Sequence, residues 1–203
     1  ASAELQAVLN EGDLAGLKAL CAKHVSAKPG STAKDFVSQP FLGNGMAPTL
    51  AFRAVALGHV VMLQWMIESG ASAKEANAAG ETLLHKAVGT PRPAGKATSD
   101  LNARLAAVLL DAGADPNAAT TRDPQAGSTP LHIAAIIDLA AAQCLLDRGA
   151  DVNATNAAGL TPAALCESVD FADPLKKAAA IEFLTDAARK VGSGEVSGTG
   201  AGK

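Results

Sequence analysis

Residues 127–154 read GSTPLHIAAIIDLAAAQCLLDRGADVNA, a stretch that divides into two short helices and a turn. Thr129 is a typical helix N-cap residue, and Pro130 suits the first helical position, which needs no N–H donor. Leu131 starts an apolar series at helical spacing, and a second apolar series follows it. Gly149 comes just after that second series, where a left-handed C-cap favours glycine. The stretch therefore predicts a helix, a short turn, a second helix and an extended turn.

Related segments occur at several other places in the chain. Residues 80–87 (GETLLHKA) repeat the opening of this stretch, and residues 109–118 (LLDAGADPNA) repeat its close. Weaker copies of the opening begin at residues 49–54 (TLAFRA) and 159–163 (GLTPA). The chain is therefore built from repeats of one unit, and not from a single stretch of this kind.

The threonines that open these segments define the repeat length. They are Thr49, Thr82, Thr129 and Thr161, at successive distances of 33, 47 and 32 residues. TPLH followed by two helices and a turn, at a period near 33 residues, resembles the ankyrin repeat. The long middle distance includes residues 91–100 (PRPAGKATSD), whose composition is typical of a loop. The resemblance implies an all-α repeat solenoid of about four repeats after an N-terminal cap.

We expect the repeat domain to cover residues 1–190. Its parts are a cap at 2–25, a long loop at 26–45, and repeats at about 46–75, 76–118, 119–154 and 155–190. The cap lacks the TPLH opening, as terminal repeats often do, because one of their faces meets solvent. The loop carries two prolines and three glycines and shows no helical period. The Gly/Ser-rich residues 191–203 are expected to form a flexible tail.

The composition excludes several classes of function. Hydrophobic residues make up 48% of the 203 residues, but aromatic residues make up only 3%, which favours tightly stacked helices with an aliphatic core. A formal net charge of −3 provides no basic face for a nucleic acid. No apolar run reaches the roughly 18 residues of a membrane span, so we expect no membrane insertion.

The cysteines and the N-terminus bear on the cellular compartment. Cys21, Cys144 and Cys166 lie far apart on apolar helical positions, so we expect buried thiols and no disulfide. This favours the cytoplasm or another reducing compartment. No signal-peptide pattern is visible. The sequence begins at Ala1 without a methionine, which leaves import into an organelle with a removed leader as the alternative.

The ionisable residues do not form a catalytic or metal-binding pattern. His85 and His132 occupy the histidine of the TPLH motif, where the resemblance implies an imidazole that bonds to backbone and connects neighbouring turns. Residues 89–96 (GTPRPAGK) have one residue too many for a phosphate-binding loop, and Ala97 stands where that loop needs Ser or Thr. We therefore expect no catalytic residue, no metal and no cofactor. The residues expected to maintain the repeats are Thr82, His85, Gly113, Thr129, Pro130, Leu131, His132 and Gly149.

The resemblance also implies a binding surface, formed by the first helices on a concave face and by turns that project as fingers. The expected partner-binding residues near the helix ends are Leu57, Thr90, Ile136, Ile137 and Val169. Those of the fingers are Ala78, Ala79, Glu81, Ala157, Ala158 and Leu160. The alternative for the apolar members is that they pack beneath a neighbouring loop. Phe36 and Phe41, in the loop at 26–45, either fold back onto the first repeats or contact a partner, and we expect a partner.

The function that the resemblance implies is protein–protein interaction without catalysis or a small-molecule substrate. We expect a scaffold or accessory subunit of a multi-subunit assembly, and the alternative is a transient regulator that sequesters a client protein. A more remote hypothesis is an enzyme whose site lies in the loops at 26–45 and 91–103. Those loops contain no His, Cys or Glu, and Asp35 and Asp100 are their only acids.

Overall fold

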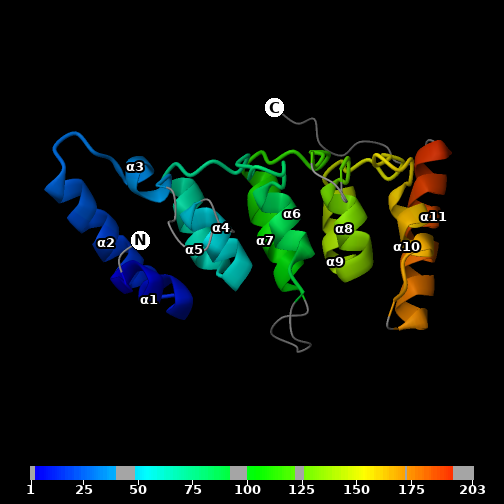
Figure 1. Cartoon of the computed structure of the whole chain (residues 1–203), viewed down its shortest axis with the longest axis horizontal. Coiled ribbons are helices and arrows are strands. Elements are labelled where there is room, and N and C mark those ends of the chain that lie inside the picture. Colours follow the sequence, from blue (N-terminus) through cyan, green and yellow to red (C-terminus); the bar gives the residue numbers. More distant parts are fainter. Residues whose placement is uncertain (1–2, 40–48, 92–99, 122–125, 172, 194–203) are drawn as a thin grey trace.

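A computed structural model describes residues 3–39, 49–91, 100–121, 126–171 and 173–193. These residues form 11 helices and no strands. Antiparallel helix pairs follow one another along a single axis, and the turns that connect successive pairs lie along one edge (Figure 1). The predicted all-α repeat solenoid is therefore confirmed. None of the helices in the described residues is long and apolar enough to cross a membrane.

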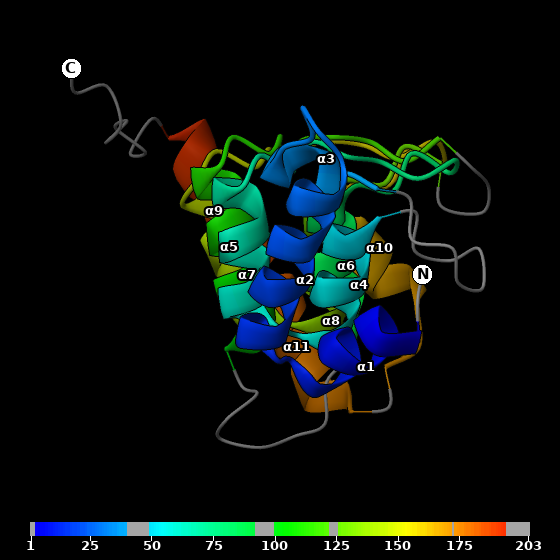
Figure 2. The same ribbon diagram turned by 90° about the vertical axis from the view of Figure 1, so that its left-hand side faces the viewer.

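The helices form a cap followed by two layers. The cap consists of α1 (Ala3–Glu11) and α2 (Leu14–Ala27), and the short α3 (Ala33–Val37) follows it. The first helices of the repeats are α4 (Leu50–Leu57), α6 (Leu83–Gly89), α8 (Pro130–Ile137) and α10 (Pro162–Ser168). The second helices are α5 (Val60–Glu68), α7 (Leu101–Asp111), α9 (Leu139–Leu146) and α11 (Pro174–Gly192). Seen along the stack, the extended turns project beyond the side on which α4, α6 and α10 lie (Figure 2).

Local capping residues determine where the first helices begin. The hydroxyl of Thr82, the N-cap of α6, accepts a bond from the backbone N–H of His85 at 3.3 Å. Pro130 occupies the first turn of α8, as its missing N–H allows. Asp138 both ends α8 and caps α9, accepting bonds from the N–H groups of Ala140 and Ala141 at 3.0 and 3.3 Å. The connection between α8 and α9 is one residue, against two between α4 and α5, which explains why Thr129 and Thr161 are 32 residues apart and Thr49 and Thr82 are 33.

Small residues let the first helices approach one another closely. The fifth residue after the opening threonine is Ala54 in the first repeat, Ala87 in the second, Ala134 in the third and Cys166 in the fourth, and each of them has 0% of its surface exposed. These residues belong to one continuous apolar cluster that runs through all the repeats. Each repeat therefore buries its apolar side chains only against its neighbours, as expected for a solenoid.

The segment at 26–45 differs from our prediction of a long loop. Residues 33–37 form α3, whose N-cap Thr32 exchanges capping-box hydrogen bonds with Asp35. The ring of Phe36 is only 5% exposed and lies 5.5 Å from the ring of His24 on α2. Phe36 therefore folds back onto the chain's own helices, and the prediction that it contacts a partner is wrong. A helix of five residues is too short to produce a visible apolar period.

Other predictions in the less regular parts of the chain fall outside the described residues. Phe41 is one of them, and so is most of the loop that begins at Pro91. The last helix continues to Gly192, two residues beyond the expected end of the repeat domain at 190. The rest of the predicted tail, from residue 194 onward, is also outside the described residues.

The second and third repeats each contain one buried histidine, His85 and His132, that connects the repeat to the turn that follows it. The backbone N–H of Thr82 donates to Nδ1 of His85 at 3.2 Å, so Nε2 carries the proton and donates to the carbonyl of Ser128 at 3.0 Å. His132 accepts from its own N-cap N–H at 3.2 Å and donates to the carbonyl of Leu160 at 2.9 Å. Both rings are 0% exposed. Each imidazole therefore satisfies buried backbone groups in two adjacent turns.

These histidines make stability dependent on pH. Burial lowers the pKa of both His85 and His132 from the ordinary value of 6.5, so the unfolded chain is protonated first as pH falls. The free energy of unfolding should be highest above pH 6.5 and should decrease from there down to the folded pKa of each ring. The slope is at most about 1.4 kcal/mol per pH unit for each histidine. Urea unfolding followed by circular dichroism at about pH 7.5 and about pH 5.5 measures this difference.

The effect of Glu75 protonation on stability must be separated from that of the histidines. Burial raises the pKa of the Glu75 carboxyl, so protonation of Glu75 stabilises the folded chain as pH falls, which opposes the histidine effect. The measurement is therefore made in Glu75→Gln, with His132→Ala in the same background expected to show a smaller pH dependence. Equal stability at the two pH values in Glu75→Gln would contradict the assigned neutral, buried state of the rings.

The substitution Leu131→Ala tests whether each repeat is stabilised by packing against its neighbours. The Leu131 side chain is 0% exposed within the apolar cluster, and Leu131→Ala should lower the free energy of unfolding by about 2–5 kcal/mol because it leaves a cavity. The matched control is Leu175→Ala, because Leu175 is 81% exposed and its truncation should change stability by less than about 0.5 kcal/mol. Similar losses for the two variants in urea unfolding would show that the packing has been misassigned.

Candidate protein-binding surface

Each first helix leaves one stripe of side chains accessible. On α8, Ile133 and Ile136 are half-buried and Ile137 is 40% exposed, whereas the other residues of the helix are buried. Residues at positions i, i+3 and i+4 lie on the same side of a helix. The open side of α8 is therefore a narrow aliphatic stripe that faces away from the core.

The same stripe recurs on the neighbouring first helices, which pack side by side in the order α4, α6, α8 and α10. We call the combined surface the inner face. It consists of Arg53, Ala56 and Leu57; Lys86, Gly89 and Thr90; Ile133, Ile136 and Ile137; and Leu165, Ser168 and Val169, all of which are half-buried or exposed. The stripes are so close that a Cβ atom added to Gly89 would lie 3.0 Å from a methyl group of Ile133. The inner face is thus one continuous surface across the repeats.

The fingers next to the inner face carry mostly small side chains, with Glu81 as a charged residue, and hydrogen bonds to their backbone groups hold them in place. The side chain of Asn77 accepts bonds from the N–H groups of Ala79 and Glu81 at 2.9 and 3.0 Å, which shapes one finger. The carbonyl of Ala79 in turn accepts a bond of 2.9 Å from the N–H of Thr121 in the next finger. Ala78, Ala157 and Ala158 are exposed, and Ala79, Glu81 and Leu160 are half-buried.

The structure brings together most of the residues that the sequence singled out for partner binding. Leu57, Thr90, Ile136, Ile137 and Val169 lie on the inner face, and the six predicted finger residues lie beside it. Some of these residues also have bonds within the chain. The hydroxyl of Thr90 donates to the carbonyl of Lys86 at 2.7 Å, and the carbonyl of Leu160 accepts the bond from His132. Among the described residues predicted to bind a partner, Phe36 lies elsewhere, in the core.

Sequence reasoning missed the first position of each stripe. These residues are Arg53, Lys86, Ile133 and Leu165, each four residues after the opening threonine of its repeat. They are also four residues before Leu57, Thr90, Ile137 and Val169, which the sequence did indicate. Helical spacing of i and i+4 was therefore the signal that could have identified them. We call these four residues the leading row.

The two cations of the leading row have no acidic partner among the described residues. A guanidinium nitrogen of Arg53 donates to the side-chain oxygen of Asn10 at 2.7 Å, which is a bond to a neutral group. The ion pairs formed by described residues are Arg148 with Asp111 and Arg189 with Asp186, and neither involves Arg53 or Lys86. The N-terminal half of the inner face is therefore cationic.

A pocket of about 300 Å³ adjoins the other end of the inner face. It lies between the end of α8, the start of α9 and the start of α11. Its lining is mainly apolar and includes Ile136, Ile137, Phe171, and the charged residues Asp138 and Lys176. The pocket thus extends the aliphatic half of the inner face toward the last helix.

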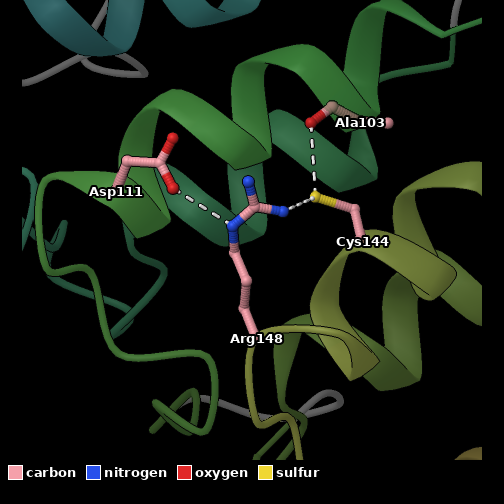
Figure 3. Close-up of polar contacts among 4 residues, drawn as sticks. All are labelled: Ala103, Asp111, Cys144 and Arg148. Carbon is pink, nitrogen blue, oxygen red and sulfur yellow. Dashed lines mark hydrogen bonds and ion pairs between the residues drawn. The ribbon is translucent and has the colours of Figure 1, made fainter. Parts of the chain in front are cut away.

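Apart from the inner face, a polar cluster lies between α7 and α9 and connects the second and third repeats (Figure 3). The guanidinium of Arg148 lies 3.2 Å from the carboxylate of Asp111 and donates to the sulfur of Cys144 at 3.1 Å. The Cys144 thiol donates to the carbonyl of Ala103 at 3.5 Å. Burial raises the pKa of this thiol, which favours the protonated form over a nucleophilic thiolate. The cluster therefore links neighbouring repeats and lacks an activated cysteine.

The described residues contain no group of three or more potential metal ligands.

Comparison with known proteins agrees with the geometry. Residues 53–156 match the family model for ankyrin repeats in three copies. No curated protein matches the chain. Ankyrin repeats generally mediate protein–protein interaction and are typically non-catalytic. The model match covers more than half of the sequence, and the helix pairs, histidine bonds and projecting turns have the arrangement that the motif implies. The chain belongs to the ankyrin-repeat family.

Proposed function

We propose that this chain is a non-catalytic scaffold or accessory subunit that binds another protein of a multi-subunit assembly through its inner face and fingers. The observation that carries this proposal is the aliphatic stripe on α8, where Ile133, Ile136 and Ile137 are half-buried or exposed along a helix that is otherwise buried. An accessible apolar surface of this kind gains free energy when a partner covers it. The fingers contribute small side chains that allow close approach.

Ile137 provides the direct test of this surface. Ile137→Glu and Leu57→Glu should greatly reduce recovery of the partner, because each places a charge where an apolar surface becomes buried. The control is Val61→Glu on α5, since Val61 is 62% exposed on the opposite layer of helices. Affinity purification followed by mass spectrometry measures recovery, and circular dichroism checks folding. Normal recovery with both inner-face variants would exclude this surface, whereas unfolding of both would show that these residues serve the core.

A scaffold or subunit differs from a transient regulator in the lifetime of its complex. A largely apolar interface should give a slow dissociation rate, so the purified chain should co-migrate with its partner in stoichiometric amounts. Size-exclusion chromatography of the natural complex at low and high dilution measures this. Dissociation on dilution, with the partner recovered in an altered activity state, would instead favour the regulator that sequesters a client.

A further inference from the structure

We propose that the partner binds the inner face with an extended segment that carries carboxylates at one end and a bulky apolar side chain at the other. The carboxylates contact Arg53 and Lys86, and the apolar side chain enters the pocket beside Ile137. This inference rests on the proposed function and specifies the chemistry of the partner at the same surface.

The leading row changes character along the solenoid. Its residues are cationic in the first two repeats, Arg53 and Lys86, and aliphatic in the last two, Ile133 and Leu165. Neither cation pairs with a carboxylate among the described residues, although the chain as a whole has a net charge of −3. Two accessible cations on the neighbouring helices α4 and α6 attract carboxylates and favour an acidic segment at this end of the inner face.

Acidic residues lie beside the inner face and not on it. The carboxylate of Glu81, in the finger before α6, accepts a bond of 2.8 Å from the side-chain amide of Asn77, and two further acids lie toward the other end of the face. Asp138 connects α8 to α9, and Glu167 is exposed on α10. Both would repel a carboxylate of the partner, since like charges that face each other across an interface disfavour that arrangement. The two ends of the inner face therefore select the same orientation, with acids near α4 and α6 and an apolar group near α8.

The pocket next to Ile137 suits one large apolar side chain. Its volume of about 300 Å³ is at the lower limit of small-molecule sites, which range over about 300–1,000 Å³. Ile136, Ile137 and Phe171 supply apolar walls, and the pocket opens beside the accessible stripe of α8. An apolar side chain of the partner can therefore enter it while the flanking backbone follows the inner face.

The spacing of the helices predicts the spacing of these groups in the partner. Packed helices lie about 8–10 Å apart, so Lys86 is about one to two helix spacings, or 8–20 Å, from the pocket. An extended chain advances about 3.3 Å per residue, so this distance corresponds to about two to six residues. A second carboxylate, for Arg53 on the next helix, should come about three residues further from the apolar residue.

Selection from a random peptide library tests this inference without knowledge of the partner. Phage that display random peptides of about twelve residues, long enough to span the predicted spacing, are selected on the immobilised full chain. Enriched peptides should carry Asp or Glu about two to six residues from Leu, Ile, Phe or Trp. Lys86→Glu should remove the acidic preference, and Ile137→Glu should remove the apolar one. Arg104→Glu on α7 and Val61→Glu on α5 are matched controls that should select the same peptides as the wild type.

Fluorescence polarisation of the most enriched peptide then quantifies the effect. Lys86→Glu should weaken its binding by about tenfold or more, and raised salt should weaken binding to the wild type. Enriched peptides without acidic residues, an acidic preference that survives Lys86→Glu, or no enrichment at all would overturn the inference. If Ile137→Glu abolishes binding of peptides that lack acids, the inner face is still the binding surface and only the assigned chemistry fails. If Val61→Glu abolishes binding and the inner-face variants do not, the proposed function itself fails.

Discussion

The register of this solenoid depends on one interaction, the hydrogen bond from a buried imidazole to the backbone carbonyl of the next turn. His85 and His132 each join the N-cap of a first helix to a carbonyl in the following finger, at Ser128 and Leu160. The bond sets the distance between successive fingers, because a buried donor without a partner would be costly. Correct finger spacing also aligns the first helices, and this alignment turns separate stripes into one inner face.

The repeats that lack this histidine show which contacts take the place of its hydrogen bond. In the first repeat, Phe52 stands at the histidine position and is 1% exposed, so apolar packing occupies the space. There the hydroxyl of Thr49 donates to the carboxylate of Glu75 at 2.7 Å and connects the helix start to the following turn. In the fourth repeat, Ala164 takes the position, and no further repeat follows it among the described residues. The histidine bond therefore connects the second repeat to the third and the third to the fourth, and the bond from Thr49 to Glu75 takes its place after the first repeat.

The features predicted well from the sequence are those that depend on local chemistry. The caps of Thr82 and Thr129 and the left-handed Gly149, with φ of 88°, follow from the needs of helix ends, which are the same in every repeat. The short helix α3 was missed because its burial comes from contacts with distant helices and leaves no period in the sequence. The pocket beside Ile137 was missed for a similar reason, since it depends on where α11 lies relative to α8 and α9.

The inner face can change its chemistry without a change in the fold. Lys86 and Ile133 are adjacent in sequence to the buried Ala87 and Ala134, but a rotation of about 100° per residue places them outside the buried side of the helix, where they remain half-buried. Close packing of the first helices requires small residues at the buried positions and places no such demand on the leading row. A cationic residue in one repeat and an aliphatic one in the next therefore fit the same backbone. Recognition can vary from repeat to repeat for this reason, whereas the alanine and histidine positions keep the repeats stacked.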